Sequence, residues 1–153
     1  MSEDAFRCLF RVRFAEVDAQ RIVFNSRYGE YTDLVAGELF CAMFSVASAR
    51  DTLDTRLVKQ TTQWRRPARF DDVIEARAWT SHIGTSSFTI RTEFRREGEE
   101  LLLVEVETVY VAVDSEGIGS RPLSEHERAC IHGGARGVVV DLSGPRRSAQ
   151  VER

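Results

Sequence analysis

The stretch FAEVDAQRIVFNSRY, residues 14–28, joins two segments with different periodicity and decides how the chain folds. Before it, residues 6–13 alternate between apolar and mostly charged side chains, which predicts a strand. After it, apolar residues recur at helical spacing from Tyr28 to Leu39, which predicts a long helix. Asn25 or Ser26 is expected to begin that helix, because either side chain can accept a hydrogen bond from the first turn.

The expected helix ends between residues 40 and 49, and two of its features suggest how it packs. Leu34 and Ala36 widen the apolar stripe. Gly37 lies inside the helix, where glycine costs up to about 1 kcal/mol relative to alanine. We therefore expect a close approach to a sheet at Gly37.

Strand patterns follow the helix at residues 58–66, 73–82, 87–96 and 101–113, with turns between them. The last of these is apolar enough on both faces to be central or to lie at an interface. One amphipathic helix followed by an antiparallel meander predicts an α+β fold with the helix packed on one sheet face. Ser124 and Glu127 have capping-box spacing for a short second helix, residues 124–131. We assign residues 1–132 to one domain and 133–153 to a C-terminal tail, whose apolar patch 138–142 either docks or adds a strand.

The composition excludes some classes of function. The 153 residues are 42% hydrophobic and 29% charged, which is typical of a globular chain. Twenty of the 21 basic residues are arginines, yet the net charge is −3, so no general affinity for nucleic acid is expected. No apolar run reaches the ~18–20 residues that span a bilayer, and the N-terminus is acidic. We expect a cytoplasmic protein with no membrane partner.

The most informative residue for chemistry is Asp18, in a loop seven residues before Asn25. A carboxylate can act as a base or a nucleophile on a carbonyl whose oxygen faces the free N–H groups of a helix N-terminus. A structural alternative is that Asp18 only forms an Asx-turn and Asn25 only caps the helix. The three histidines lack the spacing of a metal site, so no metal is expected.

Several motifs together resemble one family. In residues 14–28, Glu16, Asp18, Ile22, Val23, Phe24 and Tyr28 match the N-terminal signature of hotdog-fold acyl-CoA thioesterases of the 4-hydroxybenzoyl-CoA thioesterase type. Further matches follow in order at residues 64–72, 83–87, 109–114 and 121–123, so that the resemblance spans residues 6–131. It implies a hotdog fold, a long central helix on a curved antiparallel sheet, and hydrolysis of an acyl-CoA to a free acid and coenzyme A.

The resemblance also implies roles for individual residues. Asp18 matches the catalytic carboxylate, as nucleophile or general base, and the backbone N–H of Asn25 matches the donor that polarises the thioester carbonyl. The substrate-binding positions it implies are Phe24, Tyr28, Asp33, Thr85, Ser86 and Ser87. The last three form a turn that approaches the substrate from a neighbouring subunit, so a homodimer or homotetramer with shared sites is expected. No cofactor is implied beyond the coenzyme A of the substrate.

Two departures and one group of arginines qualify these implications. Arg21 stands where the family often has glycine, so the loop is expected to differ in shape. Asn25 stands where one branch has histidine, so no imidazole base is available there. Four arginines are candidates for the coenzyme A phosphates, namely Arg65, Arg66, Arg95 and Arg96. Their alternative role is cross-strand pairing with glutamates on a solvated sheet face.

Two other functions remain to be weighed. A non-catalytic hotdog protein would bind an acyl-CoA or an acyl-carrier protein without turnover. A hotdog dehydratase needs a histidine after the aspartate, and the stretch after Asp18 has none. The acyl group, whether short, long or aromatic, is left open.

Overall fold

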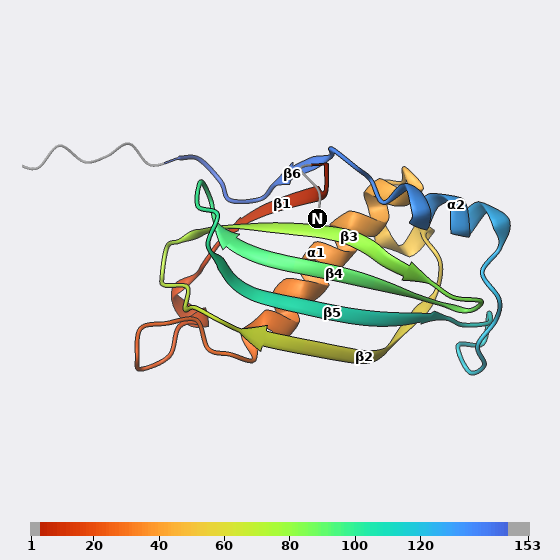
Figure 1. Cartoon of the computed structure of the whole chain (residues 1–153), viewed down its shortest axis with the longest axis horizontal. Helices are drawn as coiled ribbons and strands as arrows, with labels where there is room; N and C mark the ends of the chain where they lie inside the picture. The colour runs from red at the N-terminus through yellow and green to blue at the C-terminus, as the bar shows by residue number, and fades with distance from the viewer. Residues whose placement is uncertain (1–3, 147–153) are drawn as a thin grey trace, which may run out of the picture.

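The computed structural model describes residues 4–146 and contains one long helix held by a six-stranded sheet (Figure 1). The predicted order of strand, helix and meander is confirmed. The strands are β1 Phe6–Arg11, β2 Thr55–Trp64, β3 Val73–Ile83, β4 Ser87–Arg96, β5 Leu102–Ala112 and β6 Val139–Asp141. The helices are α1 Arg27–Phe44 and α2 Glu125–Gly133, with 3-10 turns η1 Phe14–Glu16 and η2 Ala49–Asp51.

The sheet has the order β2-β5-β4-β3-β1-β6. Every neighbouring pair is antiparallel except β1 and β6, which run parallel. β5 lies between β2 and β4, which confirms that the most apolar strand is central. β2 is an edge strand whose residues are mostly exposed.

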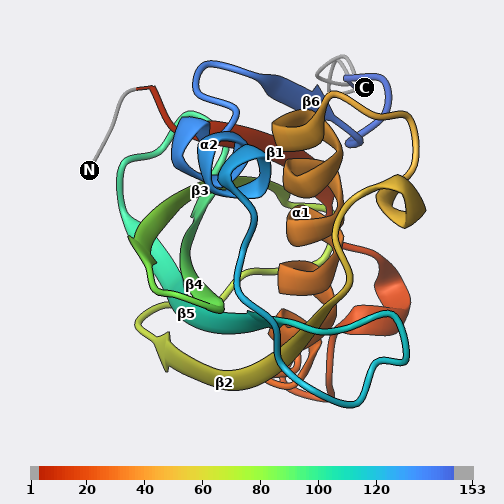
Figure 2. The same ribbon diagram turned by 90° about the vertical axis from the view of Figure 1, so that its right-hand side faces the viewer.

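The sheet curves around α1, so that the helix fills its concave side (Figure 2). Tyr28, Tyr31, Val35 and Leu39 are all buried, as the helical spacing predicted. Aromatic contacts join helix and sheet, including Tyr31 with Phe10 at 4.6 Å between ring centroids. The α+β class is therefore confirmed.

Three local predictions are wrong. Leu34 is 40% exposed and does not widen the buried stripe, although Ala36 does. A Cβ at Gly37 would meet nothing within 4 Å, so no part of the sheet approaches the helix closely there. Ser26 is the residue before α1, but neither it nor Asn25 caps the helix with its side chain.

The chain beyond β5 returns to the first strand. Ser124 accepts the N–H of Glu127 at 3.1 Å and so caps α2, while the Glu127 carboxylate pairs with Arg121 instead of completing a capping box. Residues Val139–Asp141 then add β6 beside β1. Residues 147–153 of the predicted tail lie outside the described residues. None of the described helices is long and apolar enough to cross a bilayer.

Candidate active site

The loop between β1 and α1 is closed on itself around Asp18. The N–H of Asp18 donates to the Ile22 carbonyl at 2.9 Å, and the Asp18 carbonyl accepts the N–H of Arg21 at 2.9 Å. One carboxylate oxygen, Oδ1, accepts the N–H of Gln20 at 2.8 Å, so the Asx-turn is present. Oδ2 takes no part in that bond. The Asx-turn therefore fixes the carboxylate and leaves one oxygen available for chemistry.

Arg21 adopts a left-handed conformation with φ of 65°. A side chain is unfavourable there by roughly 1–2 kcal/mol, whereas glycine accepts it readily. The loop thus takes up at Arg21 the backbone conformation that glycine favours, and the expected difference in loop shape from the family stays a prediction. Arg21 thus adds local backbone strain, while the hydrogen bond from its N–H to the Asp18 carbonyl keeps the turn closed.

The loop is also tied to the segment after β2. Val23 donates to the Ala68 carbonyl at 2.8 Å, and Ile22 forms an isolated bridge with Arg69. These bonds bring residues 18–25 opposite residues 64–67. Two stretches forty residues apart in sequence thereby become the two walls of one depression.

The start of α1 completes the depression with an unpaired donor. The carbonyl of Asn25 accepts the N–H of Tyr28 at 3.4 Å, and Phe24 accepts the N–H of Arg27 at 2.9 Å. The N–H of Asn25 itself has no acceptor among residues 4–146. Such a donor at a helix N-terminus can stabilise developing negative charge on an oxygen.

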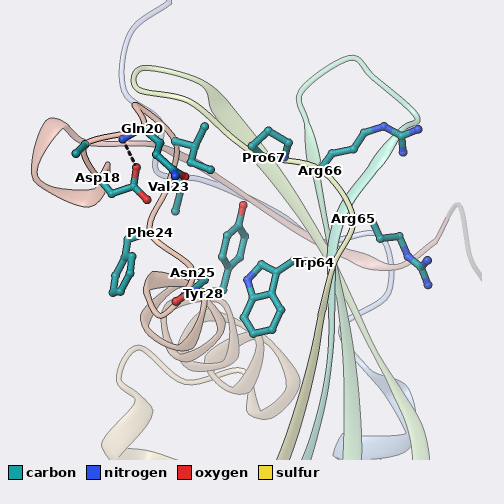
Figure 3. Close-up of a pocket in the computed structure, with 12 residues that line it drawn as sticks. Asp18, Gln20, Val23, Phe24, Asn25, Tyr28, Trp64, Arg65, Arg66 and Pro67 are labelled. Carbon is teal, nitrogen blue, oxygen red and sulfur yellow. Dashed lines mark hydrogen bonds between the residues drawn. The ribbon is translucent and has the colours of Figure 1, made fainter.

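The resulting cavity measures about 770 Å³ and is shown in Figure 3. Most of its wall is apolar or aromatic, and its lining includes Asp18, Phe24, Asn25, Tyr28, Trp64 and Pro67. Tyr28 is 2% exposed, and burial raises its pKa to about 12, so the phenol stays neutral. The structure thus brings together four of the predicted catalytic and substrate-binding residues, Asp18, Phe24, Asn25 and Tyr28.

The four candidate arginines divide into two pairs. Arg65 and Arg66 line the cavity at its edge, with guanidinium groups that extend away from Asp18 (Figure 3). Arg65 pairs with Glu105 at 2.9 Å. Arg95 and Arg96 do not line it: Arg95 is buried against Glu93 at 2.6 Å, and Arg96 binds Asp72 at 2.8 Å. Cross-strand pairing describes Arg65, whose partner Glu105 lies on β5, whereas buried Arg95 pairs with Glu93 within its own strand β4.

The remaining predicted residues lie elsewhere in the chain. Asp33 is exposed along α1, where desolvation of its carboxyl raises its pKa above the usual range. Its charge acts on Tyr110 of β5. Thr85, Ser86 and Ser87 sit at the β3–β4 turn, at the end of the sheet opposite the loop (Figure 1). Within one chain none of these four lines the cavity.

Among the cavity residues that the sequence did not predict as site residues, two shape the site most. Trp64, 54% exposed at the end of β2, forms the wall opposite the helix start, and Gln20 supplies the N–H that holds Asp18. Trp64 stood in a matched motif, but its position in the strand says nothing of what it faces. Only the bonds from residues 22 and 23 to the segment 68–69 place it opposite Asn25.

Comparisons with known proteins agree on a family. The sequence model described as "Thioesterase superfamily" matches residues 20–103, beginning two residues after Asp18. A protein of Aquifex aeolicus described as "Putative esterase" is 32% identical over 81 residues, which are 52% of this chain. The chain spans only 63% of the length of that relative.

Solved structures share the fold at low sequence identity. A thioesterase from Thermus thermophilus, complexed with coenzyme A and Zn, aligns with a TM-score of 0.77 at 21% identity, over 88% of this chain and 97% of that one. A 1,4-dihydroxy-2-naphthoyl-CoA thioesterase from Synechocystis aligns with a TM-score of 0.72 at 15% identity, over 84% and 96%. The likeness confirms the expected hotdog architecture, with the long helix on a curved sheet.

Proposed function

The chain belongs to the Thioesterase superfamily, a family of thioester hydrolases, and on that premise we propose that it hydrolyses an acyl-CoA to a free acid and coenzyme A. One observation carries the proposal: Asp18 and Asn25, whose backbone N–H has no acceptor among the described residues, line the same cavity, which is largely apolar elsewhere. A thioester needs these features together: an apolar site for its acyl group, a donor for its oxygen and a carboxylate for its carbon.

The proposed reaction begins when the thioester oxygen accepts the N–H of Asn25. As base, Asp18 takes a proton from water, and the hydroxyl adds to the carbonyl carbon. The C–S bond then breaks, and the coenzyme A sulfur leaves with that proton. As nucleophile, the Asp18 carboxylate forms an anhydride with the acyl group and expels the thiolate, and water then hydrolyses the anhydride. Either route uses water alone, and coenzyme A enters only as part of the substrate.

The placement of the remaining residues supports a shared site. Arg65 and Arg66 lie where phosphates could approach the cavity from outside, and Arg66 has no side-chain partner among the described residues. Thr85–Ser87 can reach a cavity only in another copy. Leu57, Val58 and Trp64 are exposed on the edge strand β2, which could pair with a second chain. We therefore include a homodimer or homotetramer in the proposal.

The test is release of free thiol from a panel of short, long and aromatic acyl-CoA thioesters, followed with a disulfide reagent. We expect turnover of at least one member well above the rate without protein. Tight binding across the panel with no thiol release would contradict hydrolysis and would identify a non-catalytic acyl-CoA binder. The same panel carried on an acyl-carrier protein shows which thiol the protein accepts.

A further inference from the structure

Glu16 is a buried carboxylate beside the catalytic loop that the proposed reaction does not use. It is 4% exposed, whereas its partner Arg13 has a side chain that is 77% exposed. A buried charge is unfavourable unless it is paired and hydrogen-bonded. Its retention at the base of the loop therefore needs a physical explanation.

The carboxylate is fully engaged by Arg13. Oε1 accepts the backbone N–H of Arg13 at 2.7 Å, and Oε2 accepts its Nε at 3.2 Å and its Nη2 at 2.9 Å. Burial acts to raise the pKa of Glu16, but these bonds outweigh it and hold the pKa below its usual range. Burial and the charge of Glu16 together raise the pKa of Tyr31, which places the carboxylate near α1 as well. Glu16 is thus bonded to Arg13, two residues after β1, and lines one depression together with Tyr31 of α1.

The backbone of the same residue closes the loop. The Glu16 carbonyl accepts the N–H of Phe24 at 3.0 Å, and Val17 forms a bridge with Val23 just inside that bond. Asp18 lies two residues inside this closure, and Asn25 lies one residue outside it. The Glu16–Phe24 bond therefore joins the segment that carries the carboxylate to the segment that carries the free N–H.

We propose that Glu16 is a positioning residue: its ion pair with Arg13 anchors the loop closure that sets Asp18 and the N–H of Asn25 at opposite sides of one thioester. The inference rests on the proposed function for what the two groups do. It assigns Glu16 no contact with substrate. A misplacement of about 1 Å in such a pair can lower a rate about 100-fold, which is why the anchor matters.

The test compares Glu16→Gln with Glu30→Gln. Glutamine keeps the size of Glu16 but loses its charge, and its amide N–H₂ faces the donors of Arg13. Glu30 is the control, because it is an exposed glutamate that also pairs with an arginine three residues away, Arg27 of α1. Two measurements are made below the melting temperatures of the wild type and the variants. The first gives kcat and KM on the best substrate, and the second gives amide hydrogen exchange at Asp18 and Phe24 by NMR.

In Glu16→Gln we expect kcat to fall about 10- to 100-fold with KM changed less than about threefold, because binding groups stay in place. Exchange at Phe24 and Asp18 should accelerate about tenfold or more, while exchange within β4 stays as in the wild type. Glu30→Gln should match the wild type in both. Arg13→Ala is a second variant if Glu16→Gln does not fold. It removes the exposed guanidinium and with it two of the three hydrogen bonds to the Glu16 carboxylate.

Unchanged kcat and unchanged exchange at Phe24 in either variant would overturn the inference. A fall in melting temperature alone, with kcat and loop exchange as in the wild type, would also overturn it and leave Glu16 a structural residue. Wild-type turnover in the same assay keeps the proposed function standing in both cases. Amide exchange needs no turnover, so it decides the role of Glu16 in the loop even if the wild type releases no coenzyme A.

Discussion

The two ends of the curved sheet differ in what they offer a substrate. The loop end holds a cavity of about 770 Å³ with a carboxylate and an unpaired backbone N–H. The turn end, Gly84–Ser87, has its carbonyls engaged: Ser86 accepts the N–H of Ala112 at 2.8 Å, and Thr85 accepts that of Leu123 at 2.9 Å. Its hydroxyls, and the backbone N–H groups of Thr85 and Ser86, have no hydrogen-bond partner among the described residues and are left to bind a ligand. In the proposed reaction the loop end supplies the reacting groups, and the turn end offers a substrate only hydrogen-bonding groups.

This difference separates two kinds of contribution. Changes at the loop end should lower kcat, because in the proposed reaction the groups there act on the thioester carbonyl. Changes at the turn end should raise KM, because hydroxyls from another copy would hold the substrate without touching the reacting atoms. Three substitutions test this separation and a fourth tests the stability of the loop, in order of decreasing effect.

Asp18→Asn should cause the largest loss. The amide can neither take a proton from water nor form an anhydride, so kcat is expected to fall about 10³-fold, within the range for loss of a base. The melting temperature should change little, because asparagine can still accept the N–H of Gln20. Asp51→Asn, an exposed aspartate of η2, serves as the control in the same thiol-release assay. A kcat within tenfold of wild type would remove Asp18 from the chemistry.

Asn25→Pro should come next, because proline has no N–H while its φ suits a residue beside a helix start. Without the donor, kcat should fall about 10²-fold. Asn25→Ala keeps the N–H and should retain most of the activity, since the side chain of Asn25 makes no cap. Equal losses in the two variants would mean that the side chain acts, and not the backbone.

The sequence predicted most of this arrangement and missed parts of it for identifiable reasons. Periodicity placed α1 and β4, because each buries one face along its whole length. The loop was found by its motif and its spacing to the helix. Trp64 and the separation of Arg65 and Arg66 from Arg95 and Arg96 were out of reach, because strand order and register decide them. At Gly37 the sequence predicted a contact that the structure lacks. A weak helix former suggested a close approach to the sheet, but an added Cβ there would meet no atom within 4 Å.

Ser86→Ala tests the turn end and should act weakly and differently. One lost hydrogen bond is worth about 1 kcal/mol, which predicts a rise in KM of about fivefold with kcat nearly unchanged. Ser81→Ala, on β3 and exposed, is the matched control. A fall in kcat comparable to that of Asn25→Pro would place the turn among the reacting groups and end the separation of the two ends.

Arg21→Gly should have the smallest effect and the opposite sign. Relief of the left-handed conformation at φ of 65° outweighs the added freedom of the unfolded chain. The free energy of unfolding should rise by about 0.5 kcal/mol in urea denaturation. Arg27→Gly, in the first turn of α1, should instead lower it by about 1 kcal/mol. A lower stability for Arg21→Gly would show that the Arg21 side chain contributes more than its backbone strain removes.

The central claim, that Asp18 acts on a thioester bound at the loop end, is tested most directly by a single turnover of Asp18→Asn. The variant, in excess over the best acyl-CoA substrate, is quenched at intervals and its bound thioester is measured. The predicted result is an intact acyl-CoA that is bound as tightly as by the wild type and persists about 10³ times longer. Hydrolysis of that bound thioester at the wild-type rate would contradict the claim.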